Sequence, residues 1–266
     1  MDKKTLKEKL VKKTRERVKE AFTGKDVHII KAVSVIDELD KMANLISENA
    51  REWFGFHFPE LNSLVEDNET FLKLVLIGDR KNFSEKKIME VYNNEEKAKE
   101  IEIKAKNSMG SPIEENPLKE IQKLAVKGIE IKKQRNELAE FIEKEIKEIL
   151  PDFSDLAEPL IAARILAKAG SARKLALMPS STIQLLGAEK ALFQHIRSGA
   201  KPPKYGYIFA HPMLKKVKRS EQGKFARTLA GKLSIAAKTD YFKGKSNSKE
   251  LKKELEKRIN ELNKTK

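Results

Sequence analysis

The sequence contains no cysteine, only 6% aromatic residues, 12 glycines and 9 prolines in 266 residues. The lack of cysteine excludes disulfides, thiolate metal sites and cysteine nucleophiles. No run reaches the roughly 18 apolar residues that a membrane span needs. The first residues, MDKKTLKEKL, also lack the apolar core of a secretory signal. These absences predict a protein of the cytoplasm with comparatively thin, helical cores.

The positive charge is concentrated in the last third of the chain. The whole sequence has 55 basic and 40 acidic residues, a net charge of +15. Residues 171–266 hold 23 basic and 7 acidic residues, whereas residues 1–170 hold 32 and 33. A segregated surplus of one sign indicates a polyanionic partner. Nucleic acid is favoured, with an anionic membrane or an ordinary solvated surface as alternatives.

Apolar residues recur at helical spacing along the whole chain, which predicts an all-α fold. Residues 1–83 are expected to form amino-terminal helices that pack on the body. Two long polar helices, 84–108 and 117–150, are separated by a short turn, which predicts an antiparallel coiled-coil hairpin arm over 84–150. A compact basic helical domain, 151–245, and a charged tail, 246–266, complete the predicted organisation.

Two positions interrupt the apolar seam of the second arm helix. Gly128 and Arg135 stand where a strict coiled coil would carry apolar side chains. They are interpreted as close-packing or buried-polar positions, or as signs of a weak seam.

The sequence offers no constellation for catalysis. It has no glycine-rich phosphate-binding loop of either common type. Its four histidines do not stand at metal-ligand spacing to one another, and the acidic residues of the basic domain do not pair on one helix face. An RNA-modifying enzyme would need such features, so we expect a non-enzyme without cofactor or metal.

Two predicted helices of the basic domain expose basic faces. In residues 185–197 the buried stripe is expected to be Leu185, Ala188, Leu192, Phe193 and Ile196, which leaves Lys190, Gln194 and Arg197 exposed. Gly187 and Ala188 leave backbone N–H groups accessible to a phosphate at the helix start. In residues 222–238 the exposed face carries Lys224, Arg227, Gly231, Ser234 and Lys238, where small residues would let a nucleic-acid backbone approach. The alternative for each is an ordinary amphipathic helix with a charged outer face.

The loop at 201–207 lies between these helices. It carries Lys201 and Lys204, two stiffening prolines, and the tyrosines Tyr205 and Tyr207. A tyrosine beside lysines can stack on an unpaired base or fill a hydrophobic corner.

Two further segments are singled out in the first half of the chain. Residues 51–61, REWFGFHFPEL, concentrate aromatics and are interpreted as a structural corner, with partner contact second. The turn at the predicted hairpin tip is either a simple turn or a self-association patch. That patch would comprise Ser108, Met109, Gly110 and Ile113.

Five segments together resemble the Nop family, the archaeal core protein of box C/D guide-RNA methylation particles. They are REWFGFHFPEL at 51–61, SMG at 108–110, GAEKALF at 187–193, GAKPPKYGYIF at 199–209 and GKFARTLAGKLSIAAKTDYF at 223–242. The resemblance implies a scaffold that binds a kink-turn RNA already held by a small kink-turn protein and that pairs with itself through its coiled-coil arm. It implies that Gly187, Ala188, Glu189 and Lys190 face RNA, and that Lys204, Lys224, Arg227 and Lys232 line the composite surface.

The remaining predicted RNA contacts are Gln194, Arg197, Lys201 and Lys238, of which Gln194 replaces a residue that is usually basic in the family. Members of the family also begin with a domain that holds the fibrillarin methyltransferase, and the resemblance starts beyond it. Fibrillarin is therefore expected as a partner only with that domain restored. The alternatives are a general basic RNA-binding protein and a coiled-coil adaptor whose charge is incidental.

Overall fold

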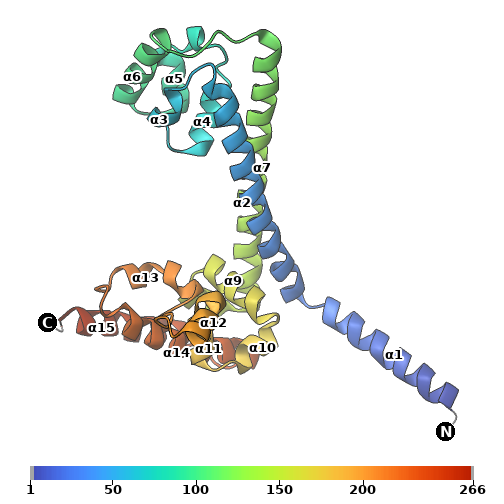
Figure 1. Ribbon diagram of the computed structural model, residues 1–266. Coiled ribbons are helices and arrows are strands. Elements are labelled where there is room, and N and C mark those ends of the chain that lie inside the picture. The colour runs from blue at the N-terminus through green and yellow to red at the C-terminus, as the bar shows by residue number, and fades with distance from the viewer. Residues whose placement is uncertain (1–2, 265–266) are drawn as a thin grey trace. The chain divides into compact units, whose positions relative to one another are not determined.

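A computed structural model describes residues 3–264, and every regular element within that range is helical. The all-α prediction is therefore confirmed. The helices form two compact units, of which unit 2 is Val35–Leu138 and unit 1 is the remainder of the chain (Figure 1). Two long helices, α2 (Lys25–Gly55) and α7 (Glu115–Ile149), contribute residues to both units. The predicted boundaries at residues 1 and 266 lie outside the described part of the chain.

Within unit 2, α7 pairs with α2. The Arg135 guanidinium donates from Nε to Asp40 Oδ1 at 2.9 Å. Gly128 is buried, and a Cβ atom built on it would lie 3.3 Å from Ile46 Cγ2 and 2.6 Å from Leu72 Cδ1. The two interruptions of the seam are thus a polar pair and a close-packing position.

The predicted pairing of α7 with a helix over 84–108 is wrong. That segment forms two short helices, α5 (Glu85–Val91) and α6 (Glu95–Lys106), which pack on each other. Asn94 separates them because its side chain accepts a hydrogen bond from Lys97 N at 3.0 Å and so begins a new helix. Four of their apolar residues, Ile88, Ala98, Ile101 and Ala105, are buried in the core of unit 2.

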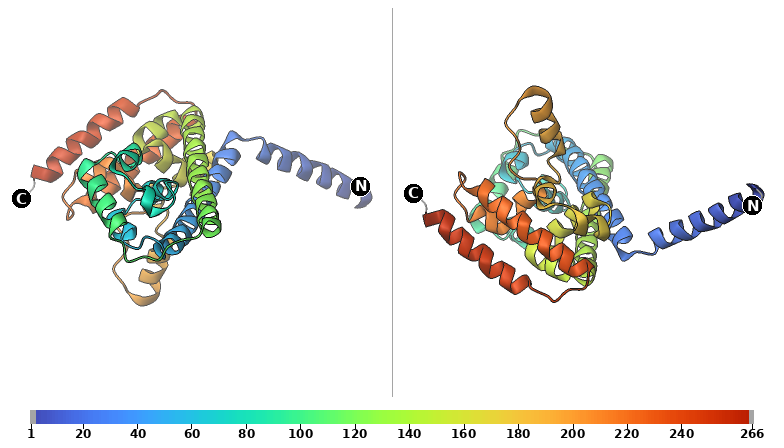
Figure 2. Two further views of the ribbon diagram at one scale, coloured as in Figure 1. Left: turned by 90° about the horizontal axis from the view of Figure 1, so that it is seen from above. Right: turned by 90° about the horizontal axis from the view of Figure 1, so that it is seen from below.

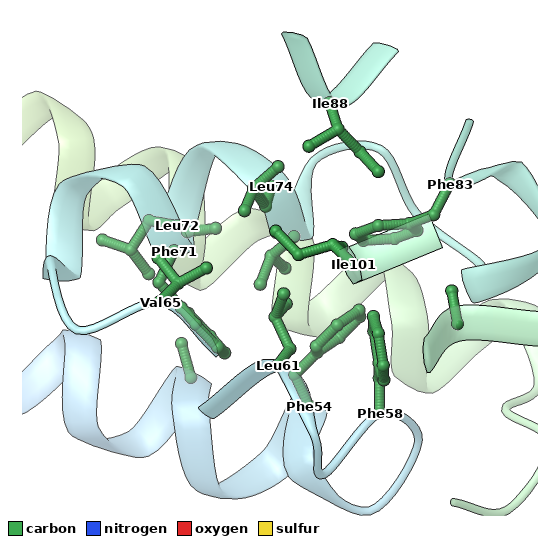
Figure 3. Packing of buried hydrophobic residues seen from close by; sticks show 14 of the residues in the cluster. Phe54, Phe58, Leu61, Val65, Phe71, Leu72, Leu74, Phe83, Ile88 and Ile101 are labelled. Carbon is green, nitrogen blue, oxygen red and sulfur yellow. The ribbon is translucent and has the colours of Figure 1, made fainter. Parts of the chain in front are cut away.

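Unit 2 has an aromatic core that closes around the 51–61 motif. Phe54 and Phe58 are fully buried, together with Phe71 of α4 (Asn68–Val75) and Leu61 of α3 (Leu61–Leu64) (Figure 3). Phe58 meets the ring of Phe83 edge-on at 5.5 Å. Truncating one such buried phenylalanine to alanine typically costs about 3–5 kcal/mol. The structural-corner interpretation thus fits Phe54, Phe58 and Leu61, whereas Trp53 and Phe56 of the same motif are exposed.

Unit 1 is organised around α14 (Gln222–Tyr241), whose apolar face is buried against α8 (Pro151–Ala157), α10 (Ala172–Leu177), α11 (Ser180–Leu185) and α15 (Ser248–Lys264). α14 and α15 lie side by side (Figure 2). Asp240 near the end of α14 accepts hydrogen bonds from the N–H groups of Asp152 and Phe153, which satisfies the start of α8. Burial raises the pKa of Asp240 despite these two donors. This unit also contains α9 (Pro159–Ala169), α12 (Glu189–Ser198), α13 (Pro212–Lys215) and the 3-10 helix η2 (Tyr207–Ala210).

The first helix, α1 (Lys3–Phe22), has apolar side chains that stay exposed, among them Leu6, Leu10 and Val18. α2, α3 and α4 contribute buried apolar residues, whereas these side chains of α1 do not, and the packing of residues 1–83 on the rest of the chain stays a prediction. No helix within residues 3–264 has the length and apolarity to span a membrane.

Candidate nucleic-acid interface

The outer face of α14 lies largely as predicted. Lys224, Arg227 and Lys238 are exposed, and a Cβ atom built on Gly231 would meet nothing within 4 Å. Ser234 differs because it is buried and its hydroxyl donates to the Met178 carbonyl at 3.4 Å. The face therefore offers cations around an open glycine.

Lys232 does not belong to this face. It is half-buried, and its ammonium group forms an ion pair with Glu254 of α15. Successive helix residues are 100° apart, which places Lys232 beside the packed surface of α14 rather than beside Arg227 and Lys224. The predicted RNA contact at Lys232 is corrected to a link between two helices of unit 1.

The predicted helix over 185–197 is broken in two. α11 ends at Leu185 and α12 begins at Glu189, and Gly187 between them has φ 92°. A Cβ atom on Gly187 would lie 2.7 Å from the ring of Tyr207, so only glycine fits this turn. Lys190, Gln194 and Arg197 share one exposed face of α12, as predicted.

The opposite face of α12 is not buried as predicted. Phe193 is 67% exposed and Ile196 is 71% exposed, while Leu192 is half-buried. The spacing of these residues is typical of a core stripe, so their exposure could not be predicted from the sequence pattern. α12 thus presents a basic face and an apolar face to solvent.

Glu189 is the first residue of α12. Its carboxylate accepts a hydrogen bond from Gly187 N at 2.9 Å and pairs with Lys168 at 3.2 Å. Burial opposes ionisation, but the Gly187 N–H and Lys168 together lower the pKa of Glu189. The Gly187 N–H is therefore already occupied by a carboxylate, which contradicts the prediction that it is accessible to a phosphate. Ala188 is half-buried at the same turn.

The loop at 201–207 is fixed by α11 and α14. Gln184 donates to the Lys204 carbonyl at 2.7 Å and accepts from Gly206 N at 2.8 Å. Tyr205 stacks on Phe209 with ring centroids 5.1 Å apart and planes 13° apart. Because Tyr207 packs on Gly187, both tyrosines have partners within the protein, while Lys201 and Lys204 remain exposed. This packing favours the alternative in which the tyrosines fill a hydrophobic corner of the protein.

The predicted self-association residues lie on a loop of unit 2 that is held by hydrogen bonds. The Arg80 guanidinium donates to the carbonyls of His57 at 2.8 Å and Gly110 at 2.6 Å. A Cβ atom on Gly110 would lie 2.1 Å from the His57 carbonyl oxygen, so only glycine allows this approach. Met109 is 87% exposed, whereas Ile113 packs against the core of unit 2 and Ser108 is bonded to Glu60.

The described residues contain no group of three or more histidine, aspartate or glutamate side chains that could hold a metal ion. Exposed cations on α12, the 201–207 loop and α14 are instead the dominant chemistry of unit 1. Such a surface can contact phosphates without reading base sequence.

Comparisons with known proteins identify the family of this chain. A family model described as Nop, snoRNA binding domain, fibrillarin, matches residues 35–261. An uncharacterised NOP5 family protein of Methanocaldococcus jannaschii is 41% identical over 250 residues, which cover 94% of this chain and 60% of that protein. Human nucleolar protein 58 is 37% identical over 236 residues, 88% of this chain and 44% of that protein.

A solved fibrillarin/Nop5p complex contains a chain of similar fold, with a TM-score of 0.52 and 23% identity over 97% of this chain and 78% of that one. The chain spans about half the length of the curated relatives it matches. The family match covers both structural units except the first 34 and last five residues. The chain therefore belongs to the Nop family of snoRNA-binding-domain proteins.

Proposed function

We propose that this protein is the non-catalytic RNA-binding scaffold of a box C/D guide ribonucleoprotein. It would bind a kink-turn RNA together with the small kink-turn protein already on it, within a particle that directs 2'-O-methylation. Fibrillarin would join through an amino-terminal domain such as its family relatives carry.

One observation carries the proposal. Unit 1 exposes cations on α12, on the 201–207 loop and on α14, and few carboxylates neutralise them. The proposed RNA contacts are Lys190, Gln194, Arg197, Lys201, Lys204, Lys224, Arg227 and Lys238. Phosphate contacts of this kind supply affinity that falls steeply with salt.

The exposed apolar face of α12 supports a composite partner. Phe193 and Ile196 are apolar and would not bind phosphate groups, but they would suit contact with a protein bound next to the RNA. A kink-turn protein bound beside the RNA would cover both faces of α12 at once. This distinguishes the scaffold from a general basic RNA-binding protein.

Self-association is proposed through unit 2. Met42, Leu45 and Trp53 are exposed on α2, and Phe56, which directly follows the last residue of α2, is 74% exposed. With Asn49 they follow one another at spacings of three or four residues, the pattern of a helix-pairing seam. Ser111 N donates to the Phe56 carbonyl at 2.9 Å, which places the Met109 loop at the end of this seam. A second copy of the chain would cover it.

The RNA proposal is tested by a gel-shift titration on a kink-turn RNA, with and without the small kink-turn protein, at two salt concentrations. Binding that requires that protein and weakens with salt supports the scaffold. Equal binding to any RNA alone would leave a general basic RNA-binding protein, and no binding in either condition would leave the coiled-coil adaptor.

A further inference from the structure

A second basic segment lies beside the predicted interface. Residues 215–219, KKVKR, which we name the basic loop, connect α13 to the start of α14. Lys215, Lys216 and Arg219 are exposed. None of them is among the RNA contacts that the sequence patterns or the family resemblance indicate.

The backbone of the basic loop is held in place. Leu214 and Val217 are buried beneath it. Asn263 of α15 accepts from Lys218 N at 3.3 Å and donates to the Lys216 carbonyl at 2.9 Å. A cationic loop whose backbone is fixed before binding loses less conformational entropy when a ligand docks than a mobile tail would.

None of the three exposed cations forms an ion pair with a described residue. Within residues 3–264, Lys215, Lys216 and Arg219 have no carboxylate within ion-pair distance. By contrast, Lys224 pairs with Glu221 at 2.8 Å and Lys232 pairs with Glu254. Like charges crowded without counter-charges repel one another, and a bound polyanion would relieve that repulsion.

Gln222 joins the basic loop to the proposed interface. It donates from Nε2 to the carbonyls of Leu214 at 3.2 Å and Val217 at 3.4 Å, and it accepts from the Tyr205 hydroxyl at 3.1 Å. A Cβ atom on the next residue, Gly223, would lie 3.5 Å from Lys204 Cδ. The basic loop, Lys204 and Lys224 therefore surround the start of α14 as one cationic band.

We propose that the basic loop binds the phosphate backbone of the same RNA through Lys215, Lys216 and Arg219, as a second set of contacts. The inference rests on the proposed function and extends it, because it enlarges the RNA footprint beyond α12, the 201–207 loop and the outer face of α14. RNA is favoured over a membrane because Leu214 and Val217 are buried, so the loop has no apolar side chain to insert into lipid. Contacts of this kind fix orientation and carry no sequence preference.

The test is the triple variant Lys215→Gln, Lys216→Gln, Arg219→Gln in the full chain. Its matched control is Lys245→Gln, Lys249→Gln, Lys253→Gln, which removes the same charge from exposed residues around the opposite end of α15. Affinity for a kink-turn RNA bearing its kink-turn protein is measured by gel shift across a salt series, and circular dichroism checks that helicity is unchanged.

We expect the loop variant to bind at least about tenfold more weakly at 0.1 M salt. The slope of log affinity against log salt concentration should become smaller by about 2–3, because each of the three lost phosphate contacts contributes about 0.7–0.9 to it. The control should keep the wild-type slope. Equal losses in the two variants, or an unchanged slope in the loop variant, would overturn the loop proposal while leaving the scaffold intact. A wild-type chain that binds no RNA would overturn both, and vesicles of anionic phospholipid that bind the wild type but not the loop variant would reassign the loop to lipid.

Discussion

The carboxylate of Glu60 accepts a hydrogen bond from the Ser108 hydroxyl at 2.6 Å, which ties together two segments of unit 2 that are distant in sequence. The same carboxylate accepts from Met109 N at 2.9 Å. Together with Arg80, which donates to the Gly110 carbonyl, it fixes the loop that exposes Met109. The exposed Met109 side chain therefore lies on a loop whose backbone is held by hydrogen bonds.

Replacing Glu60 with glutamine should lower the free energy of unfolding by about 1–2 kcal/mol at neutral pH, because the side chain keeps only one acceptor oxygen for the two hydrogen bonds. Urea denaturation followed by circular dichroism measures it. Glu90→Gln, at an exposed helical position of the same unit, is the control and should change stability little.

The effect of Glu60→Gln should also depend on pH. Burial opposes ionisation of Glu60, but the Ser108 and Met109 donors and Arg80 lower its pKa in the folded protein. A carboxyl whose folded pKa lies below its unfolded value of about 4.3 stabilises the fold above that value and loses this contribution as pH falls through the folded pKa. The difference in stability between wild type and variant should therefore shrink below about pH 4. A difference that grows on acidification would contradict this reading.

Two glycines inside helices should respond to alanine in opposite directions. Gly128→Ala should destabilise the protein by about 1–3 kcal/mol, because its Cβ would overlap the Leu72 side chain. Gly231→Ala should stabilise it by about 0.5–1 kcal/mol, because a Cβ there meets open space and alanine is the better helix former. Thermal unfolding of the two variants side by side checks both signs. A destabilised Gly231→Ala would show that this face of α14 is not open.

The positions of the long helices could be predicted from the sequence, but their packing partners could not. Helical periodicity correctly located α7 and α14 and marked Gly128 and Arg135 as unusual. It could not identify the partner of α7, because an apolar stripe specifies burial and does not specify which helix supplies it. The capping side chain of Asn94 divides 84–108, and the resulting short helices fill the core of unit 2 while α2 takes the place expected for them.

The candidate interface could be predicted only in part, because helical spacing does not show which other helices cover a given face. The cations of α12 and α14 are exposed as their spacing indicated, except that Lys232 is paired with Glu254. Phe193 and Ile196 look like core residues from their spacing alone. Their exposure depends on how far α12 stands from the remaining helices, which local sequence does not encode.

Replacing Lys224 and Arg227 with alanine should weaken assembly on kink-turn RNA by about tenfold at 0.1 M salt, since two phosphate contacts would be lost. Helicity should be unchanged because both side chains are exposed. Lys232→Ala serves as the contrast: loss of its ion pair with Glu254 should cost about 0–1 kcal/mol of stability without a specific loss of RNA affinity. A larger RNA defect for Lys232→Ala than for the double variant would refute the placement of the interface.

Substituting Met42 and Leu45 with glutamate should convert a self-associated form to monomer, because charges would replace two exposed apolar side chains of the α2 seam. Light scattering after size-exclusion chromatography reports the mass. Ile103→Glu, an exposed apolar position on α6, should leave the mass unchanged. A double variant with the same mass as the wild type would place the contact elsewhere.

The scaffold proposal as a whole is tested by the gel shift of a kink-turn RNA by the wild-type chain, with and without the small kink-turn protein, at two salt concentrations. We expect a shift that requires the kink-turn protein and weakens as salt rises. A shift of equal strength on any RNA without that protein, or no shift in any condition, would contradict the proposal.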